Sequence, residues 1–365
     1  MSDINNLKGI DDIEVSTKTI IADTNIEINL NNFFKYIPIT SYTPIEKKRG
    51  RKKKSIVEKE PQKLDEGSII TLQKGNEVRG IILKKKRIGS KTFFLHSVSV
   101  VMSIENNKFI NIKVSNNGKL QITGCKNNDQ CFKTILFLYK HIKNSESIIQ
   151  DNIFQFKNNR IQTLDKNLSE EKTPNNNNNN NNNQFEVIFD TVMQNMDYNI
   201  GFDISREKLN TFINNKTKFT SIYEGSIGTG VNIKIESRYP YEENLIKMNI
   251  KYNVEEMKEE VSYSYVINKE FIENELIYDE DYDEEEYEYT DDEMKQIKKI
   301  RENINKEDLI KKSKKEKYHT FLVFASGSII MSSRGPLMKQ VFSELLELLN
   351  ENKEQIIEKT TVREN

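Results

Sequence analysis

A pattern of short segments that occurs twice along the chain is the feature that most restricts how this sequence can fold. One copy begins at Asn25–Leu30 (NIEINL) and the other at Asn199–Ile204 (NIGFDI). Each copy continues with a short helix-like run, a later strand–turn–strand unit whose turn contains Gly118 or Gly327, and a long apolar helix. We therefore expect an internal duplication whose two halves have loops of unequal length.

The strand-like runs alternate between apolar and polar residues, which predicts an antiparallel sheet with one packed face and one open face. Two apolar helical stripes would supply the packing layer. We expect the α+β class, with two pseudo-symmetric repeats forming one antiparallel sheet and helices on one face. The side chains expected on the packed side are Val98, Val100, Met102, Ile104, Leu120, Ile122, Phe321, Val323, Ile329 and Met331, and those of the stripes are Phe132, Ile135, Leu136, Tyr139, Ile142, Met338, Val341, Phe342, Leu345 and Leu349.

The duplication and the low-complexity segments suggest the following division of the chain. Residues 1–150 would form the first repeat, with a basic insertion at about 47–90. Residues 151–184 would be a disordered linker, because nine consecutive asparagines (Asn175–Asn183) have no apolar side chain to bury. Residues 185–352 would form the second repeat, with an acidic insertion at about 237–317, followed by a polar tail at 353–365.

The charges are segregated along the chain although the net charge is only −1. Lys47–Lys54 is almost purely basic, and Tyr278–Glu293 (YDEDYDEEEYEYTDDE) is strongly acidic. Such segregation favours contact with a polyelectrolyte. The basic run is interpreted as a flexible phosphate-binding arm, a nuclear-import signal or a solvated loop. The acidic run is interpreted as a solvated loop or partner tail, or as an autoinhibitory mimic of nucleic acid.

Several classes of protein are disfavoured by the sequence. No apolar stretch is long enough for a transmembrane helix, and the polar N-terminus does not resemble a signal peptide. Cys125 and Cys131 lack partners at zinc-binding spacing, and we expect Cys131 to be a small buried side chain rather than a reactive thiol. No phosphate-binding loop or dinucleotide motif is present. We expect no cofactor, no metal, no small-molecule substrate, no membrane partner and no enzymatic activity.

At this point the residues resemble a known family. Ser115–Lys126 (SNNGKLQITGCK) and Phe321–Ser333 (FLVFASGSIIMSS) are similar to the direct repeats of the TATA-box-binding protein family, and most similar to divergent members from large DNA viruses. The family fold implies a saddle whose concave sheet grips the minor groove and whose convex helices dock initiation factors. The resemblance covers roughly residues 16–36, 93–143, 185–235 and 319–349.

The resemblance implies a set of DNA-binding residues, carried over by position. They are Phe324 as a wedge between base steps, Thr123 and Ser332 at base edges, Ile330 and Gln121 beside them, and Lys119 and Lys126 at phosphates. Arg49 and Arg51 are added as DNA-binding residues from the basic run, independently of the resemblance. Five other family positions differ. The wedge counterparts of Phe324 are Ser115, Ser97 (Leu95 or Phe94 if the alignment is shifted) and Gly228, and the positions of base-contacting asparagines hold Thr17 and Met193.

These observations favour a TATA-box-binding-like transcription initiation factor that binds promoter DNA in the minor groove through the sheet. Its partners would be double-stranded DNA and a transcription initiation factor or RNA polymerase subunits, in a nucleus or a cytoplasmic viral factory. One alternative is a saddle-fold protein-docking platform that has lost strong DNA bending. Another is an accessory module of a nucleic-acid enzyme.

Overall fold

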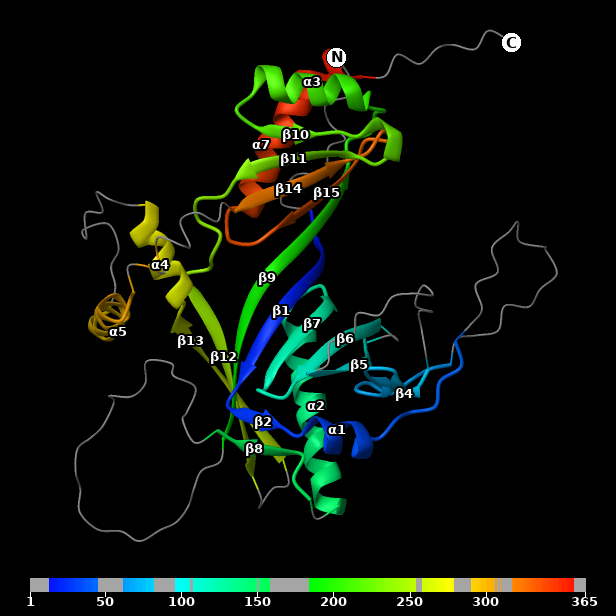
Figure 1. Ribbon diagram of the computed structural model, residues 1–365, viewed down its shortest axis with the longest axis vertical. Coiled ribbons are helices and arrows are strands. Elements are labelled where there is room, and N and C mark those ends of the chain that lie inside the picture. Colours follow the sequence, from blue (N-terminus) through cyan, green and yellow to red (C-terminus); the bar gives the residue numbers. More distant parts are fainter. Residues whose placement is uncertain are drawn as a thin grey trace, which may run out of the picture. The chain divides into compact units, whose positions relative to one another are not determined.

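The computed structural model describes residues 13–44, 62–81, 96–105, 108–149, 151–157, 184–253, 258–278, 290–305, 307, 309 and 317–357. Figure 1 shows the elements in chain order. The strands are β1 (Val15–Thr24), β2 (Ile26–Ile28), β3 (Ile69–Lys74), β4 (Glu77–Gly80), β5 (Ser97–Ile104), β6 (Lys108–Ser115), β7 (Lys119–Cys125), β8 (Phe154–Phe156), β9 (Phe185–Asn199), β10 (Thr220–Ile222), β11 (Val231–Glu236), β12 (Asn244–Asn253), β13 (Lys258–Ile267), β14 (Tyr318–Val323) and β15 (Ser328–Ser333). The helices are α1 (Leu30–Tyr36), α2 (Asn128–Ile149), α3 (Arg206–Lys216), α4 (Lys269–Tyr278), α5 (Asp291–Glu302), α7 (Met338–Glu351) and α8 (Lys353–Ile356), with a 3-10 turn at Gly225–Ile227.

The chain divides into two compact units. Unit 1 contains the described residues of Met1–Lys18, Thr191–Ile246 and Tyr265–Asn365. Unit 2 contains those of Thr19–Asp190 and Lys247–Ser264. Each unit combines an antiparallel sheet with helices, which confirms the α+β class. A single saddle formed by both units stays a prediction.

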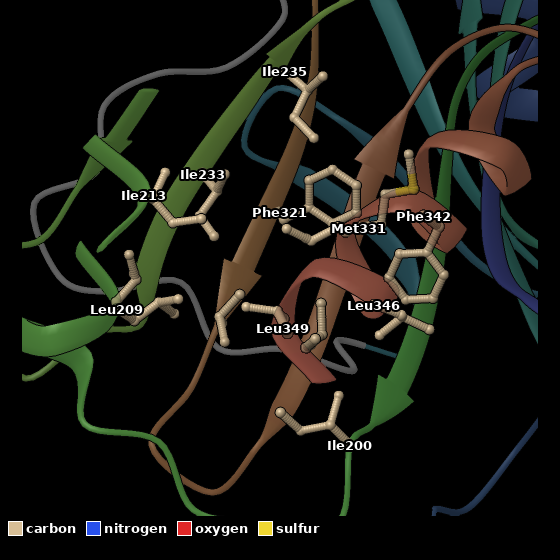
Figure 2. Close-up of a cluster of buried hydrophobic side chains, with 14 of the residues drawn as sticks. Ile200, Leu209, Ile213, Ile233, Ile235, Phe321, Met331, Phe342, Leu346 and Leu349 are labelled. Carbon is tan, nitrogen blue, oxygen red and sulfur yellow. The ribbon is translucent and has the colours of Figure 1, made fainter. Parts of the chain in front are cut away.

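Unit 1 is a sheet of order β10-β11-β14-β15-β9 with helices on one face. Strict alternation along β14 turns Phe321 and Val323 to the packed face. The Phe321 ring stacks on Phe342 of α7, with ring centroids 5.7 Å apart. Figure 2 shows these two rings among the aliphatic side chains of β11, β15, α3 and α7. The α7 stripe predicted from Met338 to Leu349 is buried as expected, and Leu346 joins it.

Unit 2 has the sheet order β1-β7-β6-β5-β3-β4. The predicted packed face is confirmed, because Val98, Val100, Met102, Leu120 and Ile122 are all buried. The expected helical stripe on α2 is partly wrong, since two of the residues expected in it are only half-buried. Its buried set is Gln130, Cys131, Thr134, Ile135, Leu138, Tyr139, Ile142 and Ser145, whereas Phe132 and Leu136 are half-buried.

The two sheets repeat the same order of equivalent strands, which supports the internal duplication. The pairs Ile112↔Ile122 in unit 2 and Phe321↔Met331 in unit 1 occupy the same place in the register. The sequence alignment of Asn25–Leu30 with Asn199–Ile204 is wrong by two residues. Asn29 precedes α1 and Ser205 precedes α3, so Asn29 corresponds to Ser205 and not to Asp203.

The turn glycines explain why both copies retain this motif. Gly118 and Gly327 have φ of +77° and +74°. A Cβ atom at these positions would collide with the carbonyl oxygens of Ile26 and Phe202, respectively. Backbone hydrogen bonds then join each turn to the segment before the first helix, from Ile28 N to Asn116 O at 2.8 Å and from Ile204 N to Ala325 O at 2.8 Å.

Both predicted insertions contain regular structure that the sequence analysis missed. Within residues 47–90, Ile69–Lys74 and Glu77–Gly80 form β3 and β4, and β3 pairs with β5. Within residues 237–317 lie β12, β13, α4 and α5. Most of the acidic run and the whole of Lys47–Lys54 fall outside the described residues. The Asn tract also lies outside them, so the linker stays a prediction.

The β12–β13 hairpin covers a side of α2 that does not face the sheet. In unit 2 the Phe132 ring of α2 lies 4.9 Å from the Phe189 ring of β9 and 5.0 Å from the Tyr263 ring of β13. Lys140 and Glu259 form an ion pair at 3.1 Å across the same contact. These contacts explain why Phe132 turns away from the stripe expected for it.

We predict that Gly118→Ala and Gly327→Ala each lower the free energy of unfolding by about 2–5 kcal/mol, because left-handed strain adds to a backbone collision. Gly201→Ala is the matched control. Gly201 has φ of +81° but no atom within 4 Å of an added Cβ, so only the strain of about 1–2 kcal/mol remains. Urea unfolding measures the three values, and equal losses would contradict the proposed collision.

A second prediction concerns His319, which is 1% exposed on the packed face of β14 and hydrogen-bonds Ser333 Oγ. Burial lowers the pKa of His319, and Glu344 partly offsets this shift. Below the unfolded pKa the unfolded chain binds a proton that the folded chain does not. Stability therefore falls with decreasing pH, by at most about 1.4 kcal/mol per pH unit. Urea unfolding from about pH 7 to about pH 5 should show a shallower pH dependence for His319→Gln. Identical slopes in both proteins would disprove the assignment.

Candidate nucleic-acid interface

The open face of unit 1 consists of the side chains that alternate with the buried ones. It is composed of small polar groups with a few apolar side chains and is poor in positive charge. The residues are Asn195, Asp197 and Asn199 of β9, Asn232 and Lys234 of β11, Thr320 and Leu322 of β14, and Ser328, Ile330 and Ser332 of β15. All are half-buried or exposed, so a partner can reach them from the side opposite to α7.

Hydrogen bonds fix the polar groups on this face. Ser332 Oγ donates to Asn195 Oδ1 at 2.8 Å across the β15–β9 pair. Asn199 Nδ2 donates to Ser328 Oγ at 3.0 Å at the other end of the same pair. These contacts hold amide and hydroxyl groups in fixed positions along the open face of the β15–β9 pair.

Phe324 follows β14 at the mouth of the tight turn that contains Gly327. Phe324 N donates to Ser328 O at 2.9 Å, and Gly327 N donates to Phe324 O at 3.0 Å. Because Phe321 and Val323 are fully buried, alternation turns Phe324 to the open side, where it is half-buried. The side chain therefore has the position that the sequence predicted for it, on the open side of the sheet.

The open face of unit 2 has the same arrangement of strands but different chemistry. Its side chains are Ser99 and Val101 of β5, Asn111 and Lys113 of β6, and Lys119, Gln121 and Thr123 of β7. Gln121 is paired with Lys113 and Thr123 with Asn111, and Thr123 Oγ1 donates to Asn111 O at 3.4 Å. This face is thus richer in cations than its counterpart in unit 1.

Two lysines at or beside this face, Lys119 and Lys126, have side chains exposed to solvent. Lys119 Nζ is 3.7 Å from Asp23 Oδ2, and its side chain is 57% exposed. Surface ion pairs of this kind contribute about 0–1 kcal/mol, so an anionic ligand can replace Asp23. Lys126 is exposed in the turn between β7 and α2, near Lys108. Burial lowers the pKa of Lys108, and the Lys126 charge adds to that effect.

The predicted site residues thus fall into three groups. Gln121, Thr123 and Lys119 lie together on the open face of unit 2, and Lys126 lies in the turn after it. Ile330, Ser332 and Phe324 belong to the open side of unit 1. Arg49 and Arg51 lie outside the described residues.

The register bears on the two wedge positions Ser97 and Gly228. Val231 pairs with Val323, and Val98 pairs with Val114. Continuing this register, the unit 1 counterpart of Ser97 is Gly230, so Ser97 and Gly228 are not equivalent positions, and the shifted alternatives Leu95 and Phe94 lie outside the described residues. A Cβ atom at Gly230 would lie 2.8 Å from Val323 O, so the chain approaches β14 too closely there for a larger side chain.

Other residues of the two faces escaped the sequence analysis. Asn195, Asp197 and Asn199 could have been found from alternation along β9, because they alternate with Met196 and Tyr198, which pack in the core. Lys113 could likewise have been found as the cross-strand partner of Gln121. The loop before β11 also exposes a large apolar side chain, Ile227, which is 70% exposed and had no signal in the pattern.

Two further searches concern only the part of the chain that the structure describes. There, no group of three or more His, Cys, Asp and Glu side chains is placed to hold a metal ion. None of the helices in those segments has both the length and the apolar character needed to cross a bilayer. Cys125 and Cys131 are both buried, as was expected for Cys131 as a small core side chain.

No family model matches the chain. A protein of Acanthamoeba polyphaga mimivirus named "TATA-box-binding protein-like" is 36% identical over 75 residues, which are 20% of this chain and 20% of that protein. The chain thus matches about a fifth of the length of that curated relative. Among solved structures, Methanococcus jannaschii TBP aligns with a TM-score of 0.39 and 8% identity over 93% of this chain and 98% of that chain. The 75-residue match confirms the resemblance to TATA-box-binding-like proteins of viruses.

Proposed function

We propose that this chain is a TATA-box-binding-like transcription initiation factor that binds double-stranded DNA in the minor groove. The open faces of units 1 and 2 would contact the groove, and the helical side would bring an initiation factor or an RNA polymerase subunit to the promoter. The protein would act by binding alone, without catalysis. Arg49 and Arg51 would add phosphate contacts from the basic run.

One observation carries this proposal. The two units leave the same sheet face open, and in both the equivalent cross-strand row holds small hydrogen-bonding side chains, Asn111 with Thr123 and Thr320 with Ser332. Small side chains let a sheet approach a groove closely, and hydroxyl and amide groups can donate to the acceptors of the minor groove. A solvated face would not require the same chemistry at equivalent positions of two repeats.

The protein partner would dock on α7 rather than on α2. Part of the surface of α2 is already occupied by β9 and β13 through Phe132, Phe189 and Tyr263. The side of α7 that points away from its sheet is exposed and mainly acidic. It carries Lys339, Gln340, Glu344, Glu347 and Glu351. A basic surface of a transcription factor or polymerase subunit would complement it.

A second candidate function is a protein-docking platform that does not bend DNA. The observation that favours it is Asp197, an exposed carboxylate in the middle of the unit 1 open face, opposite Ile330. A carboxylate at this position would repel the phosphates that line a groove. Duplex binding separates the two functions, because the platform would not bind DNA even at low salt.

We predict that the full chain binds a short A·T-rich duplex and that Gln121→Glu weakens this binding by roughly tenfold or more. The substitution places a negative charge on the open face of unit 2, next to Lys113. Gln340→Glu is the matched control, because it is the same chemical change on the exposed side of α7. Fluorescence anisotropy from about 50 mM to about 200 mM salt gives the affinities and the salt slope.

The outcomes separate the alternatives. A steep negative slope with selective loss in Gln121→Glu supports binding by the open face. Equal losses in Gln121→Glu and Gln340→Glu would reject the open face as the binding surface. Absence of binding to any duplex at about 50 mM salt would reject the DNA-binding function and favour the docking platform.

A further inference from the structure

We infer that the two open faces contact different parts of the duplex: the unit 2 face binds the phosphate backbone, and the unit 1 face makes the apolar contacts that bend the DNA. This inference rests on the proposed function and divides its interface into two chemically distinct halves. It follows from comparing equivalent positions, which the shared register of the two sheets identifies without ambiguity.

The difference is clearest at the central row of each face, which is defined by one cross-strand pair of open-side residues. In unit 2 the cross-strand pair is Lys113↔Gln121, and at the same place in unit 1 it is Leu322↔Ile330. One pair offers a cation and an amide, and the other offers two branched apolar side chains. Both pairs lie on the open side and are half-buried, so the difference is not a consequence of core packing.

The two faces also differ at the end beside the glycine-containing turn, where unit 1 has an aromatic side chain and unit 2 has a lysine. Phe324 of unit 1 follows β14 where Ser115 of unit 2 ends β6, and Ser328 begins β15 where Lys119 begins β7. An aromatic side chain at this end can insert between base steps, whereas serine is too small to unstack them. A lysine at this end can reach a phosphate.

The remaining charges strengthen the contrast. On unit 1, Lys234 lies with its ammonium 5.4 Å from the centroid of the Tyr318 ring, and Asp197 adds a negative charge in the central row. On unit 2, Lys113 and Lys119 bring two positive charges to the open face, and Asp23 lies 3.7 Å from Lys119. Counterion release thus favours phosphate binding at unit 2, while the apolar contacts at unit 1 release no counterions and are insensitive to salt.

The experiment exchanges equivalent residues between the two faces of the full chain. Affinity for an A·T-rich duplex is measured from about 50 mM to about 200 mM salt, and bending is measured by energy transfer between labelled duplex ends. Lys113→Leu should reduce the slope of log affinity against log salt by about 0.9 and leave the bend unchanged. Leu322→Ala should weaken binding by about tenfold at every salt concentration, with an unchanged slope.

The reciprocal substitutions test the same idea by gain of function. Leu322→Lys should increase the slope by about 0.9, because it adds one phosphate contact. Ser115→Phe should increase the bend, and Phe324→Ala should abolish most of it. Ile330→Gln serves as a second unit 1 variant if Leu322→Ala proves unstable in urea unfolding, and it should weaken binding without changing the slope.

The inference would be overturned if equivalent substitutions in the two faces had equal effects. If Lys113→Leu and Leu322→Ala change the slope equally, or if Phe324→Ala leaves the bend intact, the two faces do not differ in their contacts. This failure is distinct from that of the proposed function, in which the unchanged chain binds no duplex at all.

Discussion

The packing of one sheet face against helices is the constraint on which the rest of this structure depends. In unit 1 the stacked rings of Phe321 and Phe342 join the centre of β14 to α7, and both side chains are fully removed from solvent. Because side chains alternate along a strand, burying Phe321 fixes the opposite orientation of Leu322 and Phe324. The open face is therefore not a separate feature of the sequence but the direct consequence of how the core is packed.

Because of the duplication, unit 2 also packs one face of its sheet against helices. The loops and the added segments differ between the two units. The turn glycines recur because the backbone of the preceding segment passes too close for any side chain, as the contacts of Gly118 with Ile26 O and of Gly327 with Phe202 O show. The segments added to unit 2 instead pack on existing elements: β3 pairs with β5, and β13 contacts α2. The β12–β13 hairpin brings Tyr263 and Glu259 onto α2, so unit 2 has a covered helix where unit 1 leaves α7 exposed.

The sequence predicted the parts of the fold that depend on local periodicity. Alternation correctly identified the packed sides of β5, β7, β14 and β15, and the turn glycines correctly aligned the second part of each repeat. It missed β3, β12 and β13, because runs flanked by many charges resemble surface loops when no strand partner is known. The stripe on α2 was displaced because Phe132 packs on Phe189 and Tyr263, which are distant in sequence. The site residues carried over by resemblance, such as Gln121 and Ser332, lie on open faces, whereas Asn195, the β9 neighbour of Ser332, was not among them.

If the chain binds DNA as we propose, the energetics of bending the duplex would depend on the asymmetry between the two open faces. Unstacking one base step costs about a few kcal/mol, which must be offset by contacts that form only on the bent duplex. Phe324 can provide such contacts at unit 1, but its counterpart Ser115 cannot. At unit 2, Lys113 and Lys119 can attract phosphates whether or not the duplex is bent, so their contribution favours binding more than bending. A factor built in this way would bind DNA with an affinity governed by salt and distort it with a strength governed by a single aromatic side chain.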